Sequence, residues 1–317
     1  MKYLGIFIVL AAFTSCKSNK KTAVESGTKQ FVTDHYNITI SSDLSNRLNP
    51  KLYPKAVSDA EIASIVGMAI YPRILTHKRS MNQLDQFRID FINKKQIAEY
   101  KVNTKLLEID FSKFPTQHER IEYLKNTFQG EERKFEGEFN RIQGAAIKKP
   151  FGSDIWTYLQ QGVNGFLVNQ DKTTSKIGNN SFENRYKNVL ILLTDGYIEA
   201  GILNKDFDLS GKKINNFRAQ FLKSGDKDIL TFYKRNPQFK IHPLNNPLLK
   251  NLEVLVLELY DRTETNMGAS VHPTDLEIMK LIWGDWLKSS GVKKFELYPK
   301  FSSKGEAEKV IFKFLGV

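Results

Sequence analysis

The sequence predicts an α/β protein with a doubly wound, mostly parallel central sheet and helices on both faces. Residues 189–193 and 252–260 are almost continuously apolar, as expected for strands buried on both faces of a parallel sheet. Strand-like segments alternate with amphipathic helical segments, which predicts crossover connections. Acidic and hydroxylated residues follow the strands at 36–40 and 189–193, the place where α/β proteins usually bind their ligands.

Length and charge restrict the class of protein. A chain of 317 residues with 41% hydrophobic residues can build a sizeable core. Lys and Arg (47) exceed Asp and Glu (35), which gives a net charge of +12. Because these basic residues are scattered, a solvated basic surface is favoured and no nucleic acid partner is expected.

The amino terminus predicts export and anchoring. Lys2 precedes an apolar run at Leu4–Phe13, which is too short to span a membrane but suits a signal peptide. Phe13-Thr14-Ser15-Cys16 resembles the lipobox of bacterial lipoproteins, with Phe13 in place of the usual Leu. The resemblance implies that residues 1–16 are a lipoprotein signal peptide, that Cys16 is lipidated, and that the lipid anchors the protein to a membrane of the bacterial cell envelope, facing the periplasm or the outside. An ordinary secretory signal with an incidental Cys is the alternative. The polar residues 17–33 are expected to form a flexible tether.

The remaining residues, 34–317, are expected to form one domain. Before the central strand, the apolar spacing predicts in turn a strand at 36–40, a helix from Ser58 or Asp59 to 74, strands at 86–92 and 106–111, one or two helices at 116–147, a helix at about 155–167 and a loop at 171–184. After it come an insertion at about 199–247, a strand at 252–260 that ends in Asp261 (expected as a turn residue), a helix from Thr274, a strand at 295–298 and a helix at 303–314.

Three polar motifs stand beside the expected strand ends. They are Asp43-x-Ser45-x-Arg47 after the first strand, Gly152-Ser153-Asp154 before a helix, and Thr194-Asp195-Gly196 after the central strand. Taken alone, the middle motif is read as a helix start, because Ser and Asp are common N-cap residues.

In order and context, the three motifs look like the metal-ion-dependent adhesion site of von Willebrand factor A domains, whose fold is a Rossmann-type three-layer sheet. The resemblance covers residues 34 to 317. It implies that Mg²⁺ binds Ser45 and Ser153 directly and Asp43 and Asp195 through water. It also implies an open metal position that accepts an acidic side chain of a partner protein, with Arg47 and Asp154 as further partner contacts.

Arg47 departs from the family pattern, which has a second Ser at this position. Arginine cannot ligate a cation and its fixed charge repels one. Three outcomes follow: Arg47 turns away, the site binds metal weakly, or the guanidinium itself binds the acidic partner. The other reading of the motif is a hydrogen-bonded ion-pair network that closes this end of the sheet.

The favoured function is therefore a lipid-anchored envelope protein that binds a protein partner through the strand-end site. One alternative is a metal-dependent phosphoester hydrolase. A haloacid-dehalogenase-type enzyme would need Asp-x-Asp where this chain has Asp43-x-Ser45, and no G-x-S-x-G elbow occurs, so catalysis is disfavoured. A second alternative is a structural lipoprotein with a degenerate site that holds no metal.

Overall fold

The computed structural model describes residues 29–317 except 171, 178–179, 200–206, 266–267 and 270. The signal peptide, Cys16 and most of the expected tether lie outside the described residues. Strand β1 begins at Lys29, so residues 29–33, which the sequence assigns to the tether, are part of this strand. Among the described residues, no helix has the length and apolar character needed to cross a membrane.

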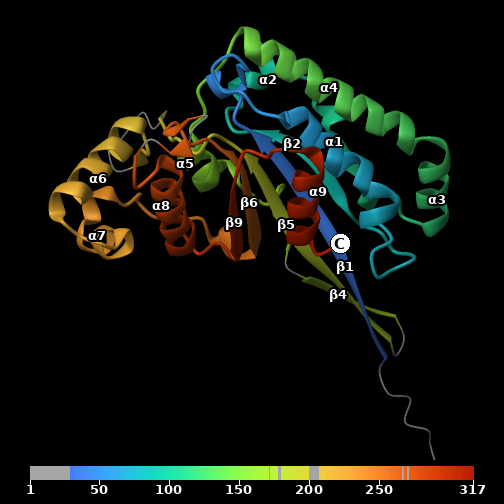
Figure 1. The fold of residues 1–317 in the computed structure, drawn as a ribbon. Coiled ribbons are helices and arrows are strands. Elements are labelled where there is room, and N and C mark those ends of the chain that lie inside the picture. Colours follow the sequence, from blue (N-terminus) through green and yellow to red (C-terminus); the bar gives the residue numbers. More distant parts are fainter. Residues whose placement is uncertain (1–28, 171, 178–179, 200–206, 266–267, 270) are drawn as a thin grey trace, which may run out of the picture.

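The chain folds as a three-layer α/β structure, as predicted (Figure 1). The main sheet has the order β3-β2-β1-β5-β6-β9, and β4 also pairs with β5. The strands are β1 (Lys29–Ser42), β2 (Gln86–Phe91), β3 (Glu108–Asp110), β4 (Lys172–Ile177), β5 (Asn180–Leu193), β6 (Leu252–Leu259) and β9 (Lys294–Pro299). Only β3 and β4 run antiparallel to their neighbours in this sheet, and β7 (Glu264–Thr265) and β8 (Gly268–Ala269) form a separate pair.

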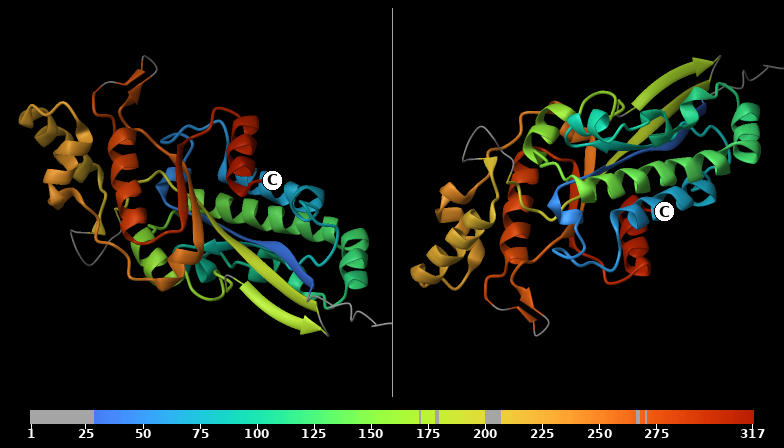
Figure 2. Two further views of the ribbon diagram at one scale, coloured as in Figure 1. Left: turned by 90° about the horizontal axis from the view of Figure 1, so that it is seen from below. Right: turned by 90° about the horizontal axis from the view of Figure 1, so that it is seen from above.

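Helices cover both faces of the sheet (Figure 2). On one face lie α1 (Asp59–Ala69), α3 (Gln117–Asn126), α4 (Phe128–Lys148) and α9 (Lys304–Leu315); on the other lie α5 (Ile155–Thr157), α6 (Gly211–Ser224), α7 (Ile229–Arg235) and α8 (Asp275–Ser289), and a short α2 (Lys95–Glu99) follows β2. Alternate residues of β5 serve the two cores: Ile191 faces the first and Leu192 the second. This alternation explains why the strand reads as a continuous apolar run.

The expected elements are present, with several changes. The helix from Ser58 has a capping box with Glu61 and ends at Ala69; the segment Ile70–Ile74 that follows is kinked at Tyr71, whose φ of −126° and ψ of 132° are not helical. The pattern at 116–147 divides into α3 and α4 at Thr127 rather than at a glycine. The helix expected to reach residue 167 ends at Gly162, where a Cβ would lie 2.6 Å from the Tyr158 ring.

The loop expected at 171–184 is wrong. Lys172–Ile177 pairs antiparallel with Asn180–Arg185, so that β4 and the start of β5 form a hairpin. The first half of β1 runs parallel beside it, from Lys29. The two buried apolar clusters contain none of the described residues of this three-stranded extension, which agrees with its polar composition. A polar strand of this kind has no apolar alternation by which the sequence could reveal it.

Candidate functional site

The two aspartates of the motifs meet because their strands are neighbours. Asp43 follows β1 and Asp195 follows β5, and the backbone N–H of Asp43 donates to the carbonyl of Leu193 at 2.9 Å. Strand β1 has β2 on one side and β5 on the other, so the strand order reverses at this point. The crevice beyond such a reversal is the usual ligand site of doubly wound sheets.

The middle motif joins this crevice through its backbone. The N–H of Phe151 donates to the carbonyl of Leu44 at 3.2 Å, which places Ser153 beside the Asp43 loop. A cavity of about 230 Å³ results, and Asp43, Ser45, Ser153 and Asp195 all line it. The structure thus brings the four expected metal ligands together around one hollow.

Asp154 does not join them. It is the N-cap of α5, and its carboxylate accepts hydrogen bonds from the backbone N–H of Thr157 (2.9 Å) and from the Thr157 hydroxyl (2.6 Å). Both carboxylate oxygens are engaged in this cap, so the arrangement agrees with the helix-start reading of the motif.

The two aspartates destabilise each other's charge. Burial raises the pKa of Asp43, although Arg47 and the hydroxyls of Ser153 and Ser45 oppose the rise. Burial, together with the negative charge of Asp43, raises the pKa of Asp195 to about 6. Two buried carboxylates that repel each other are the arrangement a divalent cation would relieve.

The hydroxyl groups of this cavity are available as ligands. Ser153 is 6% exposed, and its Oγ lies near Asp43 but has no partner with hydrogen-bond geometry. Ser45 precedes a 3₁₀ turn at Asn46–Leu48 and makes no side-chain cap to it; its N–H donates to Asp43 Oδ1 at 3.0 Å, and its hydroxyl lies beside the same carboxylate. A buried hydroxyl without a partner indicates a missing ligand or water.

Arg47 lines the wall of the cavity, but its guanidinium donors are directed to other groups. Its Nη1 and Nη2 donate to Asp59, and Nη2 also donates to the Ser42 hydroxyl at 3.2 Å. Its Nε donates to the carbonyl of Asp43 at 2.8 Å and lies 3.9 Å from the Asp43 carboxylate. The side chain is 2% exposed, so the guanidinium is a structural brace beneath the site and has no open path to a partner.

The brace continues into a buried ion-pair network. Burial alone would raise the pKa of Asp59, but Arg47 and Lys55 beside it hold the pKa below its ordinary value. Lys55 also lies 3.1 Å from Glu258, a buried residue of β6 with a φ of 74° at an irregularity in the strand. The sequence suggested a network of Asp43, Ser45, Asp195 and Arg47. The network in the structure instead joins Arg47 to Asp59, Lys55 and Glu258.

Arg262 is a second cation that lines the cavity, and the sequence reasoning missed it. It follows β6, and its guanidinium lies 3.6 Å from the centroid of the Tyr197 ring. It donates to Asp195 Oδ2 at 3.4 Å and to the Tyr53 hydroxyl at 3.3 Å, while the side chain stays 34% exposed. Its position after a buried strand was a usable signal, whereas the neighbouring Asp261 accepts the N–H groups of Thr263 and Leu276 as a turn residue.

Gly196 is required to hold Asp195 in place. Its φ is 90°, and a Cβ would lie 2.6 Å from Leu259 and 2.8 Å from Met279. Its carbonyl accepts a hydrogen bond from the Trp283 indole at 2.9 Å, which fixes the turn to α8. The Thr-Asp-Gly motif thus has a packing reason as well as a chemical one.

The donors suit a hard cation that retains water. The described part of the chain has no group of three or more His, Cys, Asp or Glu side chains placed to hold a metal. Two carboxylates and two hydroxyls remain at this site, and Mg²⁺ is commonly held by one or two carboxylates with water completing the octahedron. The residues therefore fit Mg²⁺ better than Zn²⁺, which prefers nitrogen and sulfur.

Comparisons of the chain with protein-family models, with curated proteins and with solved structures found no match. Family membership consequently remains a proposal.

Proposed function

We propose that this protein is a lipid-anchored protein of a bacterial cell envelope, with a von Willebrand factor A-like domain that binds an acidic partner protein through a divalent cation, Mg²⁺ in the first instance. The cation site consists of Asp43, Ser45, Ser153 and Asp195. One observation carries the proposal: two buried carboxylates at adjacent strand ends share a 230 Å³ cavity with a buried hydroxyl that has no partner. A hydrated cation satisfies all three groups at once.

The neighbouring side chains suit recognition of a carboxylate. A bound Mg²⁺ would supply an open coordination position for one oxygen of the partner's acid. Arg262 is half-buried, partly exposed and held by the Tyr197 ring, so it can donate to the other oxygen. Arg262 therefore takes the partner-contacting role that the sequence assigned to Arg47.

A thermal-shift titration tests the cation. We expect Mg²⁺ or Mn²⁺ to raise the melting temperature of the wild type, because a ligand of the native state stabilises it. Asp195→Asn and Ser153→Ala should abolish or strongly reduce the rise. Asp226→Asn, which removes an exposed partner of Arg235, is the matched control and should leave it intact. If neither metal raises the melting temperature of the wild type, the remaining hypothesis is a structural lipoprotein whose degenerate site holds no metal.

Stability without metal separates a binding site from a structural ion pair. In metal-free protein at pH 7, Asp195→Asn should be more stable than the wild type by about 1–3 kcal/mol, because it removes the charge whose burial raises the pKa. A structural ion pair with Arg262 would give the opposite sign. Denaturant unfolding of both proteins in chelator measures the difference.

The partner chemistry is tested with a fluorescent peptide that carries one Asp and with its Asn counterpart. Only the Asp peptide should bind, and only with Mn²⁺ or Mg²⁺ present. Turnover of a general phosphoester substrate, lost in Asp43→Ala, would instead favour the hydrolase.

A further inference from the structure

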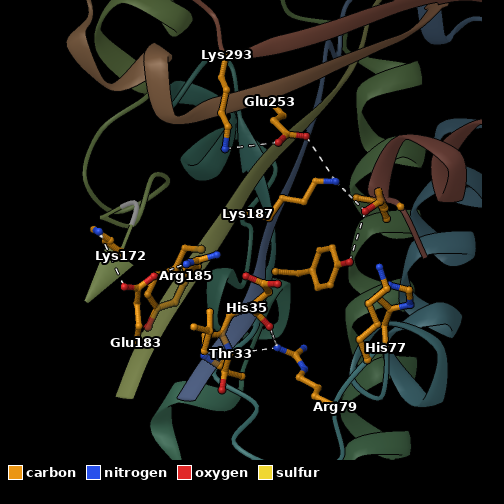
Figure 3. Close-up of a pocket in the computed structure, with 17 residues that line it drawn as sticks. Thr33, His35, His77, Arg79, Lys172, Glu183, Arg185, Lys187, Glu253 and Lys293 are labelled. Carbon is orange, nitrogen blue, oxygen red and sulfur yellow. Dashed lines mark hydrogen bonds and ion pairs between the residues drawn. The ribbon is translucent and has the colours of Figure 1, made fainter. Parts of the chain in front are cut away.

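A second and larger hollow lies at the opposite end of the sheet (Figure 3). It measures about 680 Å³ and is bounded by the first halves of β1 and β5, by β4, by the loop at 77–79, by the starts of β6 and β9, and by the end of α9. We call it the amino-end cleft. None of the cation-site residues lines it.

Positive charge dominates the amino-end cleft. Three acids line it, namely Asp34, Glu183 and Glu253, against six basic side chains: Lys78, Arg79, Lys172, Arg185, Lys187 and Lys293. Asp85, which lies behind Arg79 and does not line the hollow, neutralises one of these six. The cations come from separate segments and approach the hollow from several sides (Figure 3). This convergence differs from the scattered lysines that the sequence suggested.

Two of the acids are each shared by two cations. Glu253 lies 3.6 Å from Lys187 and 3.7 Å from Lys293. Glu183 lies 2.5 Å from Arg185 and 3.9 Å from Lys172. Each acid neutralises one charge, so each trio retains a net positive charge that faces the hollow.

The third side of the cleft is held rigidly. Arg79 pairs with the buried Asp85 at 2.5 Å and lies 3.1 Å from His35 Nδ1. Lys78 beside it has a φ of 55°, which is uncommon for a residue with a Cβ, and makes no ion pair with any acid of the described residues.

We propose that the amino-end cleft binds a phosphate-bearing anion. Converging Lys and Arg side chains recognise phosphate through charge and several donors, and the hollow has the size of a small-molecule site. The anion can be a soluble phosphate compound or the head group of an anionic lipid. Lys29, where the described chain begins, lies at this end of β1, so the cleft is at the end of the sheet nearest the expected anchor.

Two assays on the full chain distinguish the sources. One follows the melting temperature with inorganic pyrophosphate as the probe. The other measures sedimentation with phosphatidylglycerol vesicles and with phosphatidylcholine vesicles. The test variant is Lys78→Gln/Lys172→Gln/Lys293→Gln, and the control is Lys51→Gln/Lys95→Gln/Lys223→Gln, three exposed lysines outside the cleft with the same change in net charge.

We expect the cleft variant to lose affinity by roughly fivefold for each lysine, on the order of a hundredfold in all, while the control stays near wild type. Loss in the pyrophosphate assay identifies a soluble anion, and loss with phosphatidylglycerol vesicles identifies a lipid head group. The proposal fails if neither assay separates the cleft variant from the control. The cleft variant should bind Mn²⁺ with the affinity of the wild type. The anion site and the cation site are therefore tested separately, and failure of one proposal does not affect the other.

Discussion

At the scale of single residues, His35 shows how tightly hydrogen bonds fix a protonation state. The ring is fully buried in β1. Nδ1 accepts a hydrogen bond from the N–H of Leu84 at 3.2 Å and lies 3.1 Å from Arg79, so it carries no proton; Nε2 therefore donates to Asn184 at 2.9 Å. Burial, with Arg79 adding to it, lowers the pKa of His35 to about 4.

This geometry predicts a loss of stability in mild acid. The neutral ring stabilises the native state fully above the unfolded pKa of about 6.5, and that contribution is lost as the pH falls toward 4. Between pH 7 and pH 5 the loss is about 2 kcal/mol. Denaturant unfolding at both values should show a smaller loss for His35→Gln, whereas His272→Gln, at an exposed site, should keep the wild-type dependence. Equal slopes in all three proteins would contradict the assignment.

Arg262 gives a second prediction at the residue scale. Its charge competes with a cation for Asp195. At pH 8, where Asp195 is ionised, Arg262→Gln should bind Mn²⁺ about threefold to tenfold more tightly, since about 1 kcal/mol of repulsion is removed. The same variant should bind the Asp peptide more weakly. Titration calorimetry measures the first effect, with Arg235→Gln as a remote control; weaker Mn²⁺ binding would count against the placement of the cation.

At the scale of elements, the turn after β5 depends on glycine for two reasons that can be separated. Gly196→Ala adds a Cβ in a left-handed conformation and against Leu259 and Met279. Gly225, which ends α6, has a φ of 72° but open space around its Cβ position. Chemical denaturation should therefore show a loss of about 1 kcal/mol for Gly225→Ala and at least 2–3 kcal/mol for Gly196→Ala. Similar losses would mean that the turn can shift.

The same scale explains what the sequence could predict. Continuous apolar runs located β5 and β6, and Ser58 and Thr274 located helix starts, because these signals are local. The sequence could predict that Asp43, Ser45 and Asp195 lie close together, because the carboxyl ends of parallel strands meet at one edge of the sheet. The direction of Arg47 could not be predicted, since it depends on Asp59, twelve residues away on another element. The hairpin at β4 was missed because backbone pairing with β5 holds this strand in place, and its polar sequence shows no alternation of apolar residues.

At the scale of the whole molecule, the two proposed sites occupy opposite ends of one sheet. Strand β1 has 14 residues, and a rise of about 3.3 Å each makes it about 46 Å long. The amino-end cleft borders this strand as far as Tyr36, seven residues before Asp43, so the same rise separates the two sites by about 23 Å at their nearest. Groups this far apart, with no shared partner, should act independently. Because Mn²⁺ and pyrophosphate form a complex with each other, the sites are compared one ligand at a time. The rise in melting temperature with pyrophosphate should be the same in Asp195→Asn as in the wild type, and a clearly smaller rise would show that the ends communicate.

Strand β1 also sets a direction for the molecule. Its first residue continues the segment that leads to Cys16, and its last residue precedes Asp43. If a lipid at Cys16 ties the chain to a membrane, the proposed acid-binding site lies at the end of β1 farther from the attachment point along the chain. The two ends of this strand are about 46 Å apart. A partner protein bound at the acid-binding site would be held away from the membrane by a distance to which the length of β1 contributes.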